Sequence, residues 1–106
     1  MKVLLVDDHA VVRSGVRNLL ASVIDVEISE AGTGGEALQC LRQDSPNLVL
    51  LDLNLSGIGG LELLRRMILE DSSVRILVLS MHAEPLYARR AMELGARGYL
   101  QKCIVG

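Results

Sequence analysis

Short apolar runs alternate along the chain with stretches in which apolar residues recur at helical spacing. Most runs are too short for a helix and are rich in Val, Leu and Ile, as expected of strands buried on both faces. Residues 26–30 instead alternate apolar and polar side chains, which is typical of an edge strand with one wet face. The pattern predicts five strands, at residues 2–6, 26–30, 48–52, 75–79 and 96–100.

Four helices are predicted between these strands. Residues 10–22, together with the next residue, carry an apolar stripe on one helical face, made of Val12, Val16, Leu19, Leu20 and Val23. A short helix opens at Gly34, and a third helix turns three side chains inward, those of Leu61, Leu64 and Ile68. The last helix begins at Pro85 and ends near Leu94, where Gly95 suits the C-terminal cap.

Strict alternation of strand and helix implies right-handed crossovers and a parallel, doubly wound sheet. We therefore expect one α/β domain over residues 1–106. The sequence stops soon after the fifth strand, so one flank of the sheet lacks a helix, although parallel sheets need cover on both faces. From this we expect a C-terminally truncated piece of a longer protein. We also expect a dimer that buries the bare flank, with exchanged elements as one route.

The composition narrows the function classes. The net charge is −2 and the basic residues are scattered, so this chain is not expected to bind nucleic acid, and two aromatic residues are too few for base stacking. No apolar run approaches the roughly 20 residues of a membrane span. The first strand begins at Lys2, which leaves no room for a signal peptide. Cys40 and Cys103 match no metal or redox spacing, so we expect free thiols in a cytoplasmic protein, with a disulfide as the alternative.

Acidic residues follow two of the buried strands. Asp7 and Asp8 come directly after the first, and Asp52 ends the third. Open α/β sheets bind ligands at the carboxyl edge of the strands, so these carboxylates are predicted to share one cleft. Mg²⁺ suits them because it takes hard oxygen ligands from one or two carboxylates and keeps waters and a phosphate oxygen, and a backbone carbonyl near Asn54 completes the set. The alternative for the Asp pair alone is a helix N-cap.

Two further polar residues, Ser80 and Lys102, follow the fourth and fifth strands. The Lys102 ammonium suits a phosphate oxygen, and the Ser80 hydroxyl suits another. With a metal and an ammonium neutralising an incoming phosphate, one carboxylate can attack phosphorus and form an aspartyl phosphate. Asp52 lies in the middle of the set and is the candidate nucleophile.

Four sequence blocks resemble the receiver domain of two-component response regulators, in particular receivers with a LuxR-type (NarL/FixJ-like) helix-turn-helix output domain. The blocks are VLLVDDH at 3–9, LVLLDLNLSGIGGLELL at 48–64, ILVLSMH at 76–82 and GARGYLQK at 95–102. The resemblance covers nearly the whole chain. It implies a flavodoxin-like (CheY-like) fold with strand order 2-1-3-4-5, with the family's last helix missing.

The resemblance also implies a role for each site residue. Asp52 accepts phosphate from a sensor histidine kinase or a small phosphodonor, and Lys102 binds the phosphoryl group. Mg²⁺ is held by Asp8 and Asp52, by Asp7 through a water, and by the backbone carbonyl of Asn54. Ser80 and Tyr99 form the switch pair, and the positions that tune phosphoryl lifetime are Asn54 and His82. The switched surface then controls transcription through a C-terminal DNA-binding domain, without turnover of a separate substrate.

Other functions remain open from the residues alone. A haloacid-dehalogenase-type phosphatase also uses an aspartyl phosphate, but it requires an Asp at the position of Asn54, together with a cap domain. A flavin or nucleotide carrier requires a phosphate-binding loop after the first strand, where this sequence has Asp7, Asp8 and His9. A degenerate receiver would act only as an interaction module. His9 is expected near the site without ligating, and the pair Arg89 and Arg90 is expected on a solvated helix face.

Overall fold

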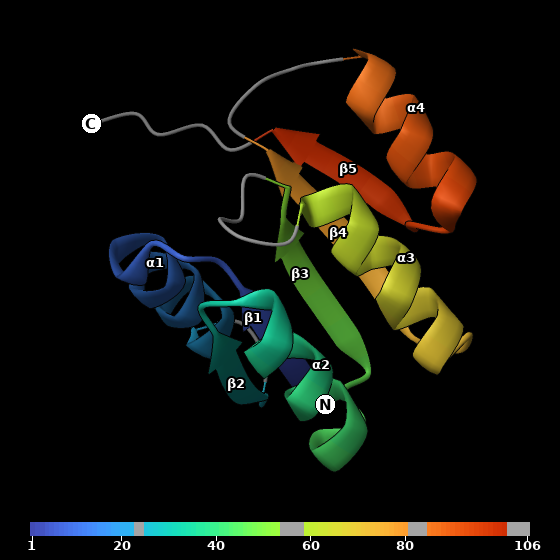
Figure 1. The fold of residues 1–106 in the computed structure, drawn as a ribbon. Coiled ribbons are helices and arrows are strands. Elements are labelled where there is room, and N and C mark those ends of the chain that lie inside the picture. The colour runs from blue at the N-terminus through green and yellow to red at the C-terminus, as the bar shows by residue number, and fades with distance from the viewer. Residues whose placement is uncertain (23–24, 54–58, 81–84, 102–106) are drawn as a thin grey trace.

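The structure, a computed structural model, describes residues 1–22, 25–53, 59–80 and 85–101. Five strands alternate with four helices in this part of the chain (Figure 1). They are β1 (Lys2–Val6), α1 (Ala10–Ala21), β2 (Glu27–Ala31), α2 (Gly34–Asp44), β3 (Leu48–Asp52), α3 (Gly60–Glu70), β4 (Arg75–Ser80), α4 (Pro85–Leu94) and β5 (Gly98–Gln101).

The strands form one parallel sheet in the order β2-β1-β3-β4-β5. The predicted flavodoxin-like fold and strand order are confirmed. The chain steps outward from β1 to β2, crosses back to β3, and continues outward to β5, so the strand order reverses between β1 and β3. At this switch point Val6 lies level with Leu51, and the residues that follow both strands meet at the carboxyl edge of the sheet.

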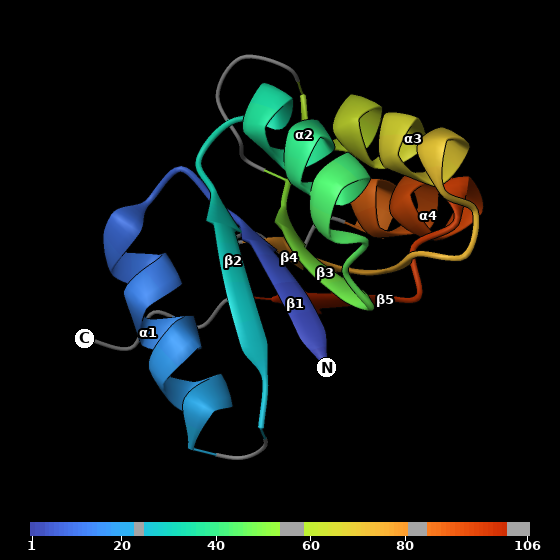
Figure 2. The same cartoon turned by 90° about the horizontal axis from the view of Figure 1, so that it is seen from below.

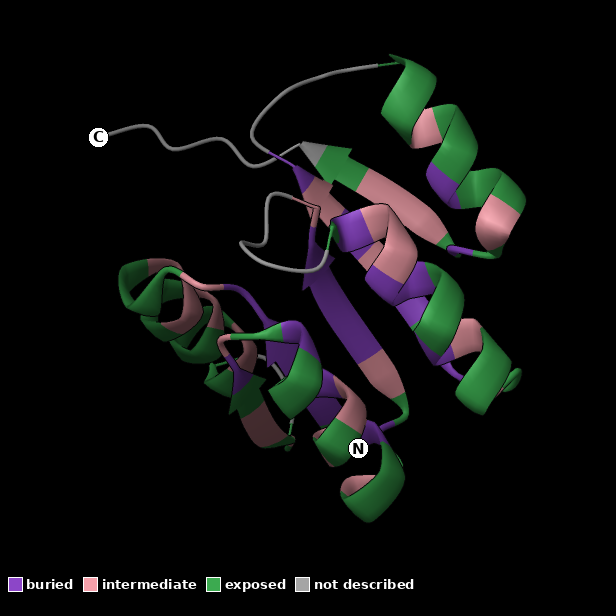
Figure 3. Cartoon of the chain, viewed as in Figure 1, coloured by how far each residue is buried: buried purple, intermediate pink, exposed green. Residues whose placement is uncertain are grey.

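The main core lies on the face of the sheet that α2, α3 and α4 cover (Figure 2). Strand side chains such as Leu4, Val49 and Ile76 are fully buried there, because each buried parallel strand sends alternate residues to this face. Helix α3 contributes the side chains of Leu63, Leu64 and Met67, which have no exposed surface. Figure 3 shows β3, the middle strand, buried over most of its length.

The opposite face is covered by α1 alone among the described helices (Figure 2). Val3, Leu5 and Leu50 are buried beneath it. Farther along the sheet, on β4 and β5, Leu77 and Leu79 are only partly buried, and Leu100 is 52% exposed. The predicted uncovered flank is therefore present in the described part of the chain.

The apolar face predicted for the first helix is too wide. Val12, Val16 and Leu20 recur every four residues and are half-buried, but Leu19 is 70% exposed, and α1 has no fully buried residue. An isolated helix on one side of a sheet contacts it along a single row of side chains, and Leu19 lies about 100° around the helix from Leu20. Val23, the last predicted member of the stripe, lies outside the described residues.

Several predicted boundaries are shifted. Strand β2 begins and ends one residue later than predicted, β4 includes Ser80, and the predicted short helix α2 extends to Asp44. The last strand begins at Gly98 instead of residue 96, because the Ala96 amide donates back to the Ala91 carbonyl and so helps to close the end of α4. Gly95 closes that helix with a φ of +117°, as predicted for a C-terminal cap.

Candidate functional site

Asp7 and Asp52 lie side by side at the carboxyl edge because β1 and β3 are adjacent and in register. The Asp7 amide donates to the Ala31 carbonyl at 3.0 Å, which extends the pairing of β1 with β2 by one residue. On the other side, the Leu53 amide donates to the Leu79 carbonyl at 3.1 Å. Asp7 is 5% exposed and Asp52 1%, so rigid backbone holds two carboxylates in a largely dry position.

Four potential ligand atoms gather at this edge. One carboxylate oxygen from each of Asp7, Asp8 and Asp52, together with a ring nitrogen of His9, all lie within 4.8 Å of one another. Like charges held this close in a buried site repel strongly, and a divalent cation removes the repulsion. The donor set is dominated by hard oxygens, which fits a cation such as Mg²⁺, Ca²⁺ or Mn²⁺.

His9 lies closer to the acidic residues than the sequence indicated. Its amide donates to Asp7 Oδ1 at 2.8 Å. Its ring Nδ1 lies 3.1 Å from Asp7 Oδ1 and 3.0 Å from Asp8 Oδ1. The His9 side chain is 63% exposed, but its ring contacts both carboxylates, so His9 belongs to the site. Its position as the N-cap residue of α1, directly after the Asp pair, was the available sequence signal.

Ser80 and Tyr99 are placed by the two strands beyond β3. Ser80 ends β4 and is 4% exposed, one residue beyond Leu79, the partner of Asp52 in the sheet. Tyr99 pairs with Val78 in the next strand and packs, half-buried, against the main core. The hydroxyl predicted to contact phosphate is therefore at the acidic edge. Three other predicted site residues lie outside the described residues, namely Asn54, His82 and Lys102.

Two arginines on α1, Arg13 and Arg17, border the acidic edge, and no sequence pattern indicated them. Arg13, on α1, donates to the backbone carbonyl of Asp7 and, through Nε, to Glu30 Oε1 at 3.0 Å. Arg17, one turn later, donates to Glu30 Oε2 at 2.9 Å. The hydrogen bonds from Arg17 and then Arg13 lower the pKa of Glu30 below its usual range. No sequence motif pointed to these contacts, since Arg13 and Glu30 are 17 residues apart.

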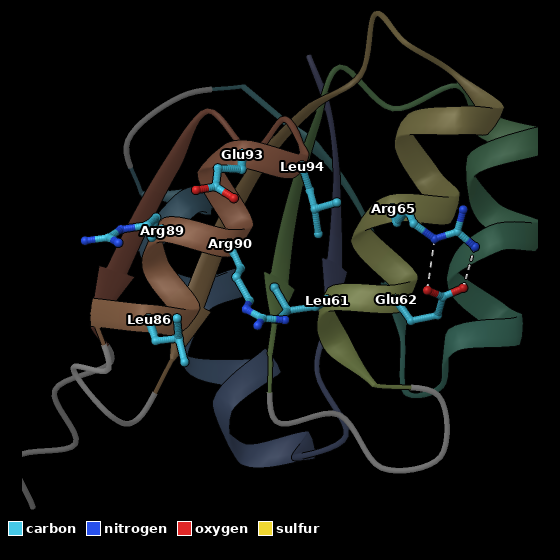
Figure 4. Close-up of a pocket in the computed structure, with 8 residues that line it drawn as sticks. All are labelled: Leu61, Glu62, Arg65, Leu86, Arg89, Arg90, Glu93 and Leu94. Atoms are coloured by element: carbon cyan, nitrogen blue, oxygen red, sulfur yellow. Dashed lines mark hydrogen bonds and ion pairs between the residues drawn. The ribbon is translucent and has the colours of Figure 1, made fainter.

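A groove of about 630 Å³ lies between α3 and α4, away from the acidic cluster (Figure 4). Glu62 forms its polar rim on α3 and accepts two hydrogen bonds from Arg65, at 2.6 and 2.9 Å, and one from Arg66 at 3.2 Å. These bonds lower the pKa of Glu62 to about 2. Arg89 and Arg90, on the α4 side, are exposed, as predicted for a solvated helix face. The groove brings together no cluster of metal-ligating side chains among the described residues.

Comparison with known proteins decides the family. Residues 3–105 match the response regulator receiver domain. The chain belongs to the response regulator receiver family. Receivers of this family act in two-component signalling and are generally signalling proteins rather than enzymes, so the phosphatase and carrier alternatives are not favoured. The acidic cluster of this receiver fits the divalent metal that such domains bind.

The receiver is similar to several characterised proteins. It is 38% identical over 103 residues to the response regulator UvrY of Escherichia coli K12, covering 96% of this chain and 47% of UvrY. A LuxR-family two-component response regulator from Aurantimonas sp. SI85-9A1 superposes with a TM-score of 0.90 at 39% identity, covering 95% of this chain and 73% of that one. The receiver therefore spans about half the length of the curated relatives it matches.

A third relative carries a modified site. A response regulator from Burkholderia pseudomallei, solved with a phosphorylated aspartic acid, a calcium ion and citrate, has a TM-score of 0.86 at 28% identity. The match covers 98% of this receiver and 61% of that chain. Response regulators interact through such receivers with histidine kinases, and often with DNA through an output domain. Among the described residues of this receiver, no helix is both long and apolar enough to cross a membrane.

Proposed function

We propose that this receiver is a phosphorylation-dependent switch in which Asp52 accepts the phosphoryl group. The observation that carries the proposal is the position of Asp52, buried on the middle strand and beside Asp7 and Asp8 at the switch point of the sheet. A carboxylate with two acidic neighbours is suited to react with a dianionic phosphodonor only when cations share the site. The phosphorylated aspartate and calcium ion of the Burkholderia relative support the same chemistry.

The proposed cation is Mg²⁺, held by Asp8 and Asp52 directly, by Asp7 through a water, and by the backbone carbonyl of Asn54. When bound, the cation neutralises part of the charge on the carboxylates and on the incoming phosphoryl oxygens. The chain's own contribution is to keep the carboxylates fixed. The hydrogen bonds of the Asp7 and Leu53 amides to neighbouring strands give that rigidity.

Phosphoryl transfer follows from the placement of Asp52. A carboxylate oxygen of Asp52 attacks phosphorus of a phosphohistidine on a sensor kinase, and an oxygen–phosphorus bond forms. The phosphorus–nitrogen bond breaks, and the imidazole nitrogen keeps its electron pair and takes up a proton. Lys102 contacts a phosphoryl oxygen as a point charge. The Ser80 hydroxyl donates to another, and the site vacated by Ser80 allows Tyr99 to turn inward.

The proposal also covers the phosphoryl lifetime, the output of the whole protein, its location and its self-association. Asn54 and His82 are the proposed positions that set the lifetime of the phosphoryl bond. In the whole protein the switched surface controls transcription through a C-terminal DNA-binding domain, whereas this receiver, with a net charge of −2, binds no nucleic acid itself. We place the protein in the cytoplasm. On the β4–β5 flank, the exposed Leu100 and the partly buried Leu77 and Leu79 support self-association, with the dimer as the proposed form.

Intact-mass measurement tests the proposal. After incubation with Mg²⁺ and acetyl phosphate, the chain is expected to gain the mass of one phosphoryl group. The gain should disappear in Asp52→Asn and in the presence of EDTA, but persist in Asp25→Asn, an exposed aspartate before β2. Persistent labelling of Asp52→Asn would exclude Asp52 as the acceptor. No labelling of the unmodified chain would favour a receiver that acts only as an interaction module.

A further inference from the structure

Arg13 connects the acidic loop to the edge strand of the sheet. Its guanidinium donates to the backbone carbonyl of Asp7 and to the carboxylate of Glu30 on β2, and its side chain is only 21% exposed. The Arg13 amide also donates to the His9 carbonyl at 3.1 Å, as part of the first turn of α1. From its position in α1, Arg13 therefore joins the backbone at Asp7 to Glu30 on β2.

Gly32 leaves room for the end of the Arg13 side chain. A Cβ built at Gly32 would lie 3.3 Å from Arg13 Nη1, tighter than ordinary van der Waals contact. Gly32 directly follows Ala31, whose carbonyl accepts the Asp7 amide. A larger residue at position 32 would therefore require the Arg13 guanidinium to shift by a few tenths of an ångström.

Resting on the proposed cation site, we propose that Arg13 is a positioning residue for that site. By tying the Asp7 carbonyl to Glu30, it fixes the loop from which Asp7 and Asp8 project, and it holds their carboxylates at the spacing that a cation requires. Groups that orient metal ligands contribute roughly 10- to 100-fold to metal affinity. Arg13 acts through the backbone and donates to neither carboxylate in the contacts described.

Removal of Arg13 distinguishes a charge effect from a positioning effect, because the two change the cation affinity in opposite directions. A guanidinium next to an acidic site repels an incoming cation, so its removal should strengthen cation binding if charge were its main influence. If Arg13 only stabilised the fold, its removal would lower the melting temperature and leave the affinity of the folded protein unchanged. Only the positioning role predicts weaker cation binding.

Arg17 provides a matched control. It lies one helical turn after Arg13, is 44% exposed, and shares the same partner, with Nη2 lying 2.8 Å from Glu30 Oε2. Its other hydrogen bond goes to the Ile28 carbonyl at 3.3 Å, and it has no described contact with Asp7 or Asp8. Arg17→Ala therefore removes an arginine–Glu30 ion pair and one positive charge, as Arg13→Ala does, but spares the acidic loop.

The experiment measures Mn²⁺ binding to the folded chain by the electron paramagnetic resonance signal of free Mn²⁺, with thermal melts alongside. Arg13→Ala is expected to weaken Mn²⁺ binding by roughly 10-fold, and Arg17→Ala to bind as the unmodified chain does. Arg13→Lys keeps the charge, but its single ammonium cannot reproduce the fork that spans two acceptors, so it should not restore affinity.

The possible outcomes separate failure of the positioning role of Arg13 from failure of the proposed cation site. Unchanged or tighter binding by Arg13→Ala, or equal weakening by Arg17→Ala, would overturn the positioning role. Full recovery in Arg13→Lys would overturn the requirement for the guanidinium fork. If the unmodified chain binds no Mn²⁺, or if Asp8→Asn binds as well as the unmodified chain, the proposed cation site itself fails, which is a result distinct from failure of Arg13 alone.

Discussion

Gly60, the first residue of α3, allows the helix to approach the strand that carries Asp52. A Cβ added at Gly60 would lie 2.5 Å from both the Cα and the carbonyl oxygen of Leu53, about 1 Å closer than the 3.4–4 Å of ordinary contact. Both atoms belong to the backbone, so no side-chain rotation can relieve the overlap. The neighbouring Gly59 has open space where its Cβ would be, which makes it a matched control.

Two rigid neighbours set the cost of Gly60→Ala. Leu53 cannot retreat freely because its amide donates to the Leu79 carbonyl, and α3 cannot withdraw without opening space around its fully buried Leu64 and Met67. Overpacking typically costs 1–3 kcal/mol, and we take about 3 kcal/mol because the clash involves backbone. The lower chain entropy of Ala in the unfolded state offsets about 0.4–1 kcal/mol. The net expectation is a loss of about 2 kcal/mol.

The Gly59→Ala variant is expected to be nearly neutral. Its φ of −62° suits an L-residue, so the entropy gain of about 0.4–1 kcal/mol applies without a clash. Ala is a poorer N-cap than Gly by a similar amount, because it stabilises the free amides of the first turn less well. Urea unfolding of the two variants should therefore separate them by about 2 kcal/mol at an unchanged slope.

The same displacement should reach the reaction, because Leu53 directly follows Asp52. At temperatures where Gly60→Ala remains folded, its rate of phosphorylation by acetyl phosphate should fall by about 10-fold, since misplacement by 1 Å can cost on the order of 10²-fold. Gly59→Ala should react at the unmodified rate. Equal stability of the two variants would refute the reasoning from the close contact, and an unchanged rate in Gly60→Ala would refute the link from α3 to Asp52.

Three further predictions concern the cation, the pH dependence and the exposed flank. Mg²⁺ at about 100 times its Kd should stabilise the folded chain by about 2.7 kcal/mol, measured by calorimetric melts. EDTA should abolish this stabilisation, and Asp8→Asn should show little of it. Hydrogen bonds from Arg17 and Arg13 lower the pKa of Glu30, so the stabilisation from the Glu30 carboxylate is present above its unfolded pKa and lost as pH falls through the lowered folded pKa. In urea unfolding, Glu30→Gln should therefore cost up to about 1 kcal/mol at pH 7 and progressively less as the pH falls. In light scattering, Leu100→Asp should reduce self-association more than Leu19→Asp on α1, and equal behaviour of the two would place the interface elsewhere.

The outline of the fold was predictable because each element signals itself locally. Apolar runs too short for helices indicated buried strands, and the four-residue spacing of Val12, Val16 and Leu20 indicated a helix that packs on the sheet. Strict alternation then favoured a parallel sheet. The order of the strands came from the family resemblance instead, since local patterns carry no information on which strands are neighbours. Leu19 shows the limit: periodicity cannot tell how wide a face the sheet will cover.

The acidic site was partly predictable for the same reason. Asp7, Asp8 and Ser80 follow or end apolar runs, and parallel strands bring their carboxyl ends to one edge, so the sequence alone indicated a shared site with Asp52. The sequence also indicated the chemistry, because hard oxygen donors in that arrangement suit a divalent cation.

Tertiary structure alone decided the contacts that hold this site in place. Arg13 reaches Glu30 only because the sheet places β2 beside β1, and Gly60 is required only because α3 packs against the Leu53 backbone. The contact of the His9 ring with both aspartates is different, because it joins neighbours in the sequence through the turn that begins α1. Sequence patterns report which residue types will be buried, helical or extended. The distances between elements depend on packing among residues far apart in the chain, and those distances decide which side chains position the site.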